Sequence, residues 1–203
     1  MIFDPAVFLL LMAAGLLTFG SVYLLRRANA AQAAAWAEFA RGHGMSARGL
    51  RLEGTCEGFP LTVEAGYLTE GRAKYAAAVL RLRVGSLLPP GFSLEHEWRG
   101  DKLPQRAGKG APELGGARFD ALFDMKNLSP ETGSLLRHEQ VREHLYEMAL
   151  ACTAFRIRDG WIEAEQRLVP ANVKELEAFT RPVLRLARTL EQIQREHSRG
   201  PSQ

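Results

Sequence analysis

The apolar residues of this chain form one continuous run near the N-terminus and shorter periodic patterns beyond it. Residues 5–25 carry no charged side chain, and Arg26 and Arg27 follow directly. A helix of about 20 apolar residues crosses the ~30 Å hydrocarbon core of a bilayer and satisfies its own backbone hydrogen bonds there. The run therefore predicts an N-terminal transmembrane helix.

A cleaved signal peptide is the alternative interpretation of this run, because residues 28–30 match a small-x-small cleavage pattern. However, the segment before the run carries Asp4 and no Lys or Arg, and the run exceeds the roughly 7–15 residues of a signal-peptide core. These departures favour a retained helix. Basic flanks stay in the cytoplasm, so Arg26 and Arg27 predict a single-pass membrane protein with its N-terminus outside and the rest cytoplasmic.

The alanine-rich segment after the run predicts a connecting helix over residues 28–44, ending at Gly42 and Gly44. It is either a continuation of the membrane helix or a short second helix. In both cases Trp36 and Phe39 share one side and are expected to dock on the following domain.

Period-two alternation predicts a β-hairpin around a turn at Glu57-Gly58. The turn would pair Leu52 with Val63 on the buried face and Arg51 with Glu64 on the other, so hydrophobic register and charge agree.

Three further strands are predicted from the same alternation, at residues 76–84, 92–98 and 117–125. In the second of them Glu95 and Glu97 are expected to face Arg81 and Arg83 of the strand before it. The third is expected to bury Phe119, Ala121, Phe123 and Met125.

Helical and hairpin signals fill the C-terminal half. Ser129-Pro130 predicts a helix start, with a break near Arg137. Residues 153–168 form a hairpin pattern around an Asp159-Gly160 turn. Asn172 then caps a long helix, in which Pro182 is expected to produce a kink.

These elements predict an α+β protein: an N-terminal transmembrane helix followed by one domain, in which helices cover one face of a mostly antiparallel sheet of about seven strands. The predicted boundaries are 1–27 for the transmembrane anchor, 28–44 for the connecting helix, 45–197 for the α+β domain and 198–203 for a polar tail.

The last helix carries a heptad-like apolar stripe that includes Leu190 and Ile193. The stripe either packs on the protein's own sheet or pairs with a second copy of the chain. The candidate interaction surface therefore joins the hairpin to this helix and consists of Arg158, Trp161, Leu190 and Ile193.

Composition excludes several functional classes. The chain has 26 basic and 23 acidic residues, a net charge of +3 and no run of like charges, so nucleic acid is not a predicted partner. Cys56 and Cys152 are isolated from each other and from metal-ligand spacings, which predicts two small buried side chains in a reducing compartment.

No candidate motif predicts a catalytic residue, a cofactor or a metal. His138 and His144 lie six residues apart, which places them about 120° apart around a helix instead of on one face. Residues 106–111 lack the complete phosphate-loop pattern. His96 lies at an inward strand position, and Asp120 alternates to the solvent side with Asp124.

Several loose motifs resemble those of single-pass bacterial membrane proteins of unknown function with a small cytoplasmic α+β domain. They are Trp36-x-x-Phe39-Ala40-x-x-His43-Gly44, Gly54-Thr55-x-x-Gly58-x-Pro60, and Phe119-Asp120-x-x-Phe123 leading into the Leu135-Leu136 helix. They mark turns and core positions, so the resemblance implies the architecture and transfers no functional residue.

A well-patterned core without a catalytic constellation predicts a membrane-anchored, non-catalytic interaction or scaffolding domain. The expected partners are the lipid bilayer and either other membrane proteins or a second copy of the chain. The alternative is an enzyme or small-ligand sensor that uses a pocket near His96 and the Gly- and Pro-rich loop at residues 100–116. A deep pocket exposing His96 or Asp120 would favour the alternative, and a filled core with an exposed apolar patch would favour interaction.

Overall fold

The computed structural model describes residues 5–70, 73–97, 119, 122–126 and 129–199; within residues 5–17 it describes only the side chains of Met12 and Leu16. The elements in chain order are α1 (Pro5–Gly42), β1 (Ser46–Ala47), β2 (Arg51–Cys56), β3 (Phe59–Glu70), β4 (Ala73–Arg83), the 3-10 turn η1 (Gly85–Leu87), β5 (Ser93–Glu97), β6 (Asp124–Lys126), α3 (Pro130–Arg137), α4 (Glu139–Ala151), β7 (Ala154–Arg158), β8 (Trp161–Arg167) and α5 (Val173–Arg199).

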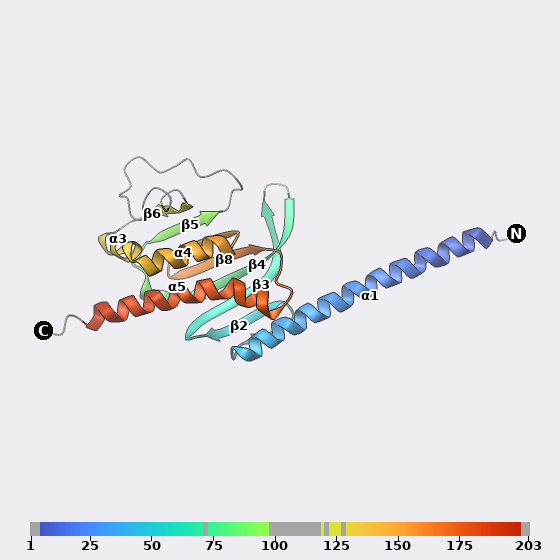
Figure 1. The fold of residues 1–203 in the computed structure, drawn as a ribbon, viewed down its shortest axis with the longest axis horizontal. Coiled ribbons are helices and arrows are strands. Elements are labelled where there is room, and N and C mark those ends of the chain that lie inside the picture. The colour runs from blue at the N-terminus through green and yellow to red at the C-terminus, as the bar shows by residue number, and fades with distance from the viewer. Residues whose placement is uncertain (1–4, 71–72, 98–118, 120–121, 127–128, 200–203) are drawn as a thin grey trace.

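The fold is α+β, as predicted. The described strands form one eight-stranded sheet in the order β1-β2-β3-β4-β8-β7-β5-β6, and every neighbouring pair is antiparallel. Helices α4 and α5 lie across one face of this sheet (Figure 1). The expected number of strands was about seven, and the additional one is the two-residue strand β1 at the sheet edge.

Helix α1 is continuous from Pro5 to Gly42, so the predicted connecting helix is a continuation of the N-terminal helix. Trp36 and Phe39 are fully buried, and they attach the C-terminal part of α1 to the domain. The helix ends as the sequence predicts: Gly44 has a φ of 66°, and the Met45 N–H donates to the Ala40 carbonyl at 2.8 Å.

The first half of α1 projects away from the domain (Figure 1). Among the residues whose side chains are described, no helical stretch is both long and apolar enough to cross a membrane.

Both predicted hairpins are confirmed in register. In the first, Leu52 pairs with Val63 and Arg51 with Glu64. In the second, Ile157 pairs with Ile162 around a turn whose two central residues, Asp159 and Gly160, have φ values of 52° and 74°. Positive φ at both positions is what the predicted type I′ turn requires.

The prediction that Glu95 faces Arg81 is wrong. Strand β4 pairs with β8, and β7 lies between β8 and β5. Glu95 therefore meets Arg156 at 3.2 Å, whereas Arg81 meets Glu64 at 2.6 Å and Glu163 at 3.1 Å. The β7–β8 hairpin lies between β4 and β5 and carries Glu163 opposite Arg81 and Arg156 opposite Glu95. Opposite charges therefore meet at both of its outer edges.

The predicted strand at residues 117–125 is wrong in the described residues before Asp124. Of the described residues in this range, only Asp124 and Met125 belong to a strand, β6, which pairs with β5. Before it, the Phe123 N–H donates to the Phe119 carbonyl at 3.2 Å, which is helical geometry. Phe119 and Phe123 are nevertheless buried as expected, because residues four apart share a side in both a helix and a strand. Asp120, Ala121 and Trp98 lie outside the described residues.

The helix boundaries agree with the predicted caps. The Ser129 hydroxyl accepts the Thr132 N–H at 3.2 Å, and α3 ends at Arg137 before α4 begins. The Asn172 side chain accepts the Glu175 N–H at 3.0 Å, and helix α5 then continues through Pro182 to Arg199.

Candidate functional site

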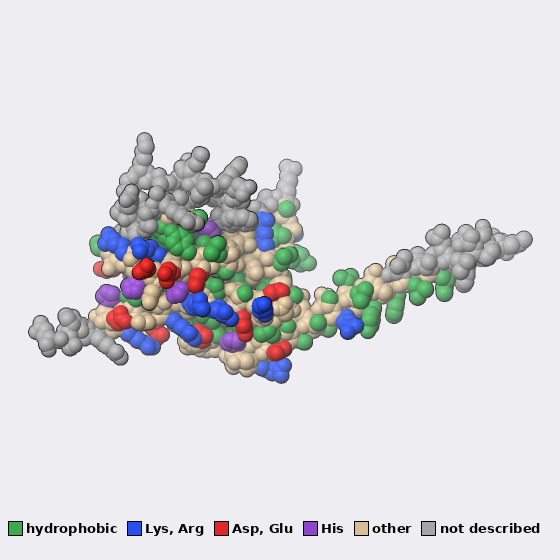
Figure 2. Space-filling view, viewed as in Figure 1, with side chains coloured by type: hydrophobic (Ala, Val, Ile, Leu, Met, Phe, Trp, Pro, Cys, Tyr) green, Lys and Arg blue, Asp and Glu red, His purple; other side chains and the backbone are tan. Residues whose placement is uncertain are grey.

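The exposed half of α1 is the first candidate functional surface. Its large apolar side chains point into solvent, with exposed fractions between 49% and 74%. They are Met12, Leu16, Phe19, Val22, Tyr23, Leu24 and Leu25. Figure 2 shows apolar side chains along the part of the helix that projects from the domain. Arg26 and Arg27, which are also exposed, end this apolar stretch.

The other half of α1 is fixed to the domain by polar contacts as well as by burial. The Trp36 indole N–H donates to the Pro170 carbonyl at 2.9 Å. The Gln32 amide donates to the carbonyls of Val169 and Pro170 at 3.2 and 3.1 Å. Both contacts reach the segment between β8 and α5, so the helix and this segment form one packed unit.

The structure separates the four residues of the predicted interaction surface. Arg158 and Trp161 are exposed and pair across β7–β8 on the open face of the sheet, where the Arg83 guanidinium lies 5.8 Å from the Trp161 ring. Leu190 and Ile193 belong to the core on the opposite face and are 2% and 7% exposed. Packing of the last helix on its own sheet therefore accounts for the apolar stripe.

An apolar groove of about 690 Å³ lies between η1 with the loop that follows it, α3 and the C-terminal part of α5. Its apolar lining includes Leu87, Leu88, Pro89, Leu135, Leu190 and Ile193. Helix α3 and the C-terminal part of α5, which line the groove, lie at the end of the domain away from the projecting half of α1 (Figure 1). The sequence does not predict it, because Leu87–Pro90 has the pattern of a connecting loop and nothing local places that loop against the last helix.

His96 is in the core, as expected, and is 6% exposed. One ring nitrogen, Nδ1, lies 3.0 Å from the Leu122 carbonyl, so it is the donor of that hydrogen bond. The ring also packs against Phe123 and Phe155. The other nitrogen, Nε2, is buried without a hydrogen-bond partner among the described residues. An imidazole that is held by a backbone carbonyl and packed between aromatic rings has the arrangement of a structural histidine.

A second, smaller cavity of about 200 Å³ borders His96, Glu95, Phe155, Arg156 and Glu163. Among its charged lining residues, Arg156 meets Glu95 at 3.2 Å, and Glu163 meets Arg81 at 3.1 Å.

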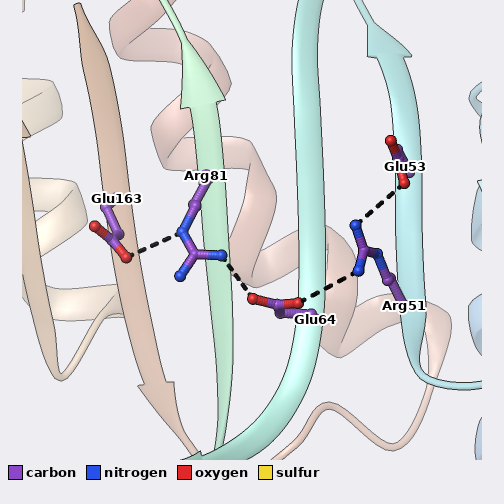
Figure 3. A network of polar contacts seen from close by, with 5 residues as sticks. All are labelled: Arg51, Glu53, Glu64, Arg81 and Glu163. Atoms are coloured by element: carbon purple, nitrogen blue, oxygen red, sulfur yellow. Dashed lines mark hydrogen bonds and ion pairs between the residues drawn. The ribbon is translucent and has the colours of Figure 1, made fainter. Parts of the chain in front are cut away.

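The open face of the sheet carries a chain of alternating charges (Figure 3). Glu163 meets Arg81 at 3.1 Å, Arg81 meets Glu64 at 2.6 Å, Glu64 meets Arg51 at 4.0 Å and Arg51 meets Glu53 at 3.3 Å. The hydrogen bond to Glu64 is the main cause that raises the pKa of Arg81. Because Arg51 and Arg81 each have carboxylates beside them, this chain of charges is a solvated ladder of ion pairs.

Both cysteines are buried free thiols. Burial raises the pKa of Cys152 to about 12. It also raises the pKa of Cys56, with the neighbouring Glu57 carboxylate as a second cause. A thiol that stays protonated at neutral pH is a poor nucleophile, so both residues act as small core side chains.

Among the residues that the structure describes, no group of three His, Cys, Asp or Glu side chains is placed to hold a metal ion. His144 lies 3.3 Å from Glu147, and Asp124 lies 3.7 Å from Lys126. Residues 100–116 lie outside the described part of the chain.

Comparisons with known proteins identify no family. No family model matches the chain, and no curated protein matches it. A crystal structure of the mycobacterial trehalose monomycolate transport factor A, TtfA, is similar, with a TM-score of 0.45 and 11% sequence identity over 78% of this chain and 94% of that one. A similarity at this level carries no argument about function.

Proposed function

We propose that this protein is a membrane-anchored, non-catalytic interaction domain in which α1 is both the anchor and part of the domain core. The observation that supports the proposal is the difference in burial between the two parts of α1. Its N-terminal part exposes seven large apolar side chains, and its C-terminal part buries Trp36 and Phe39.

The physical argument is the cost of leaving that apolar surface in water. Burying one large apolar side chain is worth about 1.5–3 kcal/mol, so seven exposed on one helix favour an apolar environment strongly. Contiguous exposed apolar surface of this kind is typical of membrane or protein contacts. The uncharged stretch from residue 5 to residue 25 has the length for a bilayer, and this supports lipid as the environment.

The interaction role is supported by what lies at the other end of the domain. The elements that line the apolar groove lie at the end of the domain away from the projecting half of α1. An anchored domain would thus present it to partners in the adjoining compartment. Burial of His96 weighs against the alternative enzyme or ligand sensor, because that alternative needs the imidazole to be exposed in a pocket.

Membrane fractionation of the full chain tests the anchor. We expect the unmodified protein to remain in the membrane pellet after alkaline extraction. A variant with Leu16→Arg and Phe19→Arg should move to the soluble fraction, because a charged side chain at the centre of a membrane helix costs about 2.5–3.5 kcal/mol on insertion scales.

The matched control is Leu16→Ala with Phe19→Ala, which shortens the same side chains without adding charge. It should stay in the pellet. The anchor proposal fails if the unmodified chain is extracted, or if the arginine variant remains with the membrane as firmly as the alanine control.

A further inference from the structure

The end of the domain beside α1 carries exposed apolar side chains of its own. Tyr67 and Leu168 are 79% and 78% exposed. Tyr67 pairs with Ala76 across β3–β4, and the Leu168 N–H donates to the Ala76 carbonyl at 3.2 Å. Tyr67 on β3 and Leu168, the residue directly after β8, therefore flank the exposed Ala76, and the three form one patch.

Basic side chains lie at the same end of the sheet as this patch. Arg167 precedes Leu168 but pairs with Ala77, so its side chain lies on the sheet face opposite to Tyr67 and Ala76, where its guanidinium is 4.8 Å from the Tyr75 ring. Lys74 is exposed on β4, one residue before Tyr75. A tyrosine and a leucine at the same end of the sheet as a lysine and an arginine match a bilayer surface, where aromatic rings lie at headgroup level and cations attract anionic lipid.

The backbone at Leu168 is unusual for an exposed apolar residue. Its φ is 70°, in the left-handed region that bulky residues rarely adopt. The hydrogen bond to Ala76 and the contacts of Val169 and Pro170 with α1 hold this conformation. The fold thus keeps the leucine side chain directed into solvent at a conformational cost.

Helix geometry gives the height of the patch relative to the membrane. The five residues from Arg27 to Gln32 rise about 7.5 Å along α1. Gln32 binds the carbonyl of Val169, the neighbour of Leu168. The headgroup layer on each side of a bilayer is roughly 5–8 Å thick, by the difference between its full thickness and its hydrocarbon core. A patch fixed at this level of α1 therefore lies at the headgroups.

The continuity of α1 favours a domain held in a fixed orientation at the bilayer surface over one that moves freely on a linker. The helix has no break between its exposed half and Trp36, so the domain has no flexible linker on which to swing away. The β3–β4 hairpin and the segment before α5 both lie at the end of the domain from which α1 projects (Figure 1).

We propose that the patch of Tyr67, Ala76 and Leu168, with Lys74 and Arg167 at the same end of the sheet, rests in the headgroup layer of the membrane that α1 enters. The partner is the lipid surface itself. This inference depends on the proposed membrane anchor, and it adds that the domain has a fixed orientation with the apolar groove directed away from the bilayer.

The test places a fluorescent probe on the full chain in lipid vesicles. Leu168→Cys is labelled with an environment-sensitive dye under native conditions, in which Cys56 and Cys152 are buried. Vesicles contain phosphatidylcholine with phosphatidylglycerol and a trace of lipid that carries a nitroxide near the headgroup. The control position is Gln192→Cys, which is exposed and lies about 30 Å further along α5 by helix rise.

We expect severalfold stronger nitroxide quenching at position 168 than at position 192 in vesicle-bound protein. Equal quenching in protein that floats with the vesicles would overturn the inference and leave the anchor intact. Protein that does not float would instead refute the anchor. A blue-shifted emission at position 168 without lipid quenching would indicate a protein contact, which also overturns the inference.

A second variant separates membrane contact from folding. Asparagine tolerates the left-handed conformation and is polar, so Leu168→Asn should keep the thermal midpoint or raise it. For this comparison the dye is attached to Ala76→Cys. Adding Leu168→Asn to that labelled protein should reduce nitroxide quenching of the dye severalfold. Unchanged quenching in this folded variant would show that Leu168 does not contact lipid.

Discussion

Gly160 shows how a single residue positions two segments that are distant in the sequence. Its carbonyl accepts the N–H groups of Val84 and Gly85, each at 2.9 Å, so the β7–β8 turn is attached to the segment after β4. A Cβ atom at Gly160 would lie 2.7 Å from the Gly85 carbonyl oxygen. The sequence explains the glycine by its turn, whereas the structure adds this close backbone contact.

Gly160→Ala should therefore be more destabilising than the turn conformation alone requires. The left-handed conformation costs a non-glycine residue about 1–2 kcal/mol, and displacing the Gly85 backbone should add about 1–3 kcal/mol. Gly44→Ala is the control, because Gly44 has a φ of 66° and a Cβ atom there would meet nothing within 4 Å. Urea unfolding of the full chain in detergent measures both, and equal losses would contradict the close-contact argument.

Because burial raises the pKa of the Cys152 thiol, we expect the free energy of unfolding to fall at alkaline pH. Its pKa is about 12 in the fold, above its ordinary value of 9.0. Above pH 9 the unfolded thiol ionises while the buried one does not, so its contribution to stability is complete below pH 9 and is lost as pH rises toward 12. Each pH unit in that window should cost about 1.4 kcal/mol from this group.

The comparison with Cys152→Ala isolates this group, because Cys56 and the other titrating residues remain in both proteins. Between pH 9 and 11 the free energy of unfolding should fall less steeply in the variant. If the free energy of unfolding fell equally steeply with pH in both proteins, the Cys152 thiol would ionise alike in the folded and unfolded chains.

At the scale of elements, α5 illustrates how one apolar pattern supports two interpretations. A heptad-like stripe fits both a coiled-coil partner and the chain's own sheet. Burial of Leu190, Val183 and Leu176 at 2% exposure or less assigns the stripe to the core. Self-association through this face would therefore require the domain to open.

Leu190→Glu should accordingly unfold the domain instead of separating two copies. A carboxylate placed in the apolar core without a partner costs several kcal/mol. Thermal melting followed by circular dichroism should show the loss. Gln192→Glu, on the exposed side of the same helix, is the control and should change stability by less than about 0.5 kcal/mol. A folded Leu190→Glu variant that merely lost crosslinking would restore the self-pairing interpretation.

For the whole molecule, the proposed anchoring of α1 in a membrane would also set the orientation of the domain relative to that membrane. The two arginines that close its apolar half predict that the domain stays on the side where the chain is made. Because α1 enters the domain core directly, the orientation of the helix is also the orientation of the domain.

Topology reporters test this orientation. We expect a fluorescent protein fused after Gln203 to be active, and an alkaline phosphatase fused at the same position to be inactive. Replacing Arg26 and Arg27 by glutamine should reduce this bias, since the positive flank is its cause. High phosphatase activity of the unmodified fusion would reverse the predicted orientation.

The sequence alone determined the elements whose causes are local. A turn fixed the register of β2 and β3, an Asp159-Gly160 pair fixed that of β7 and β8, and Asn172 fixed the start of α5. Each of these follows from hydrogen bonds between residues a few positions apart. The uncharged run closed by Arg26 is likewise a property of the sequence itself.

Only the tertiary structure decided which distant segments meet. Charge patterns allow β4 to pair with β5 as well as with β8, because both β5 and β8 carry glutamates that could meet Arg81, so local rules left that choice open. Phe119 and Phe123 could be buried from a strand or from a helical turn. The groove and the patch at Leu168 could not be predicted either, because each combines segments brought together only by packing, and sequence periodicity carries no information about that juxtaposition.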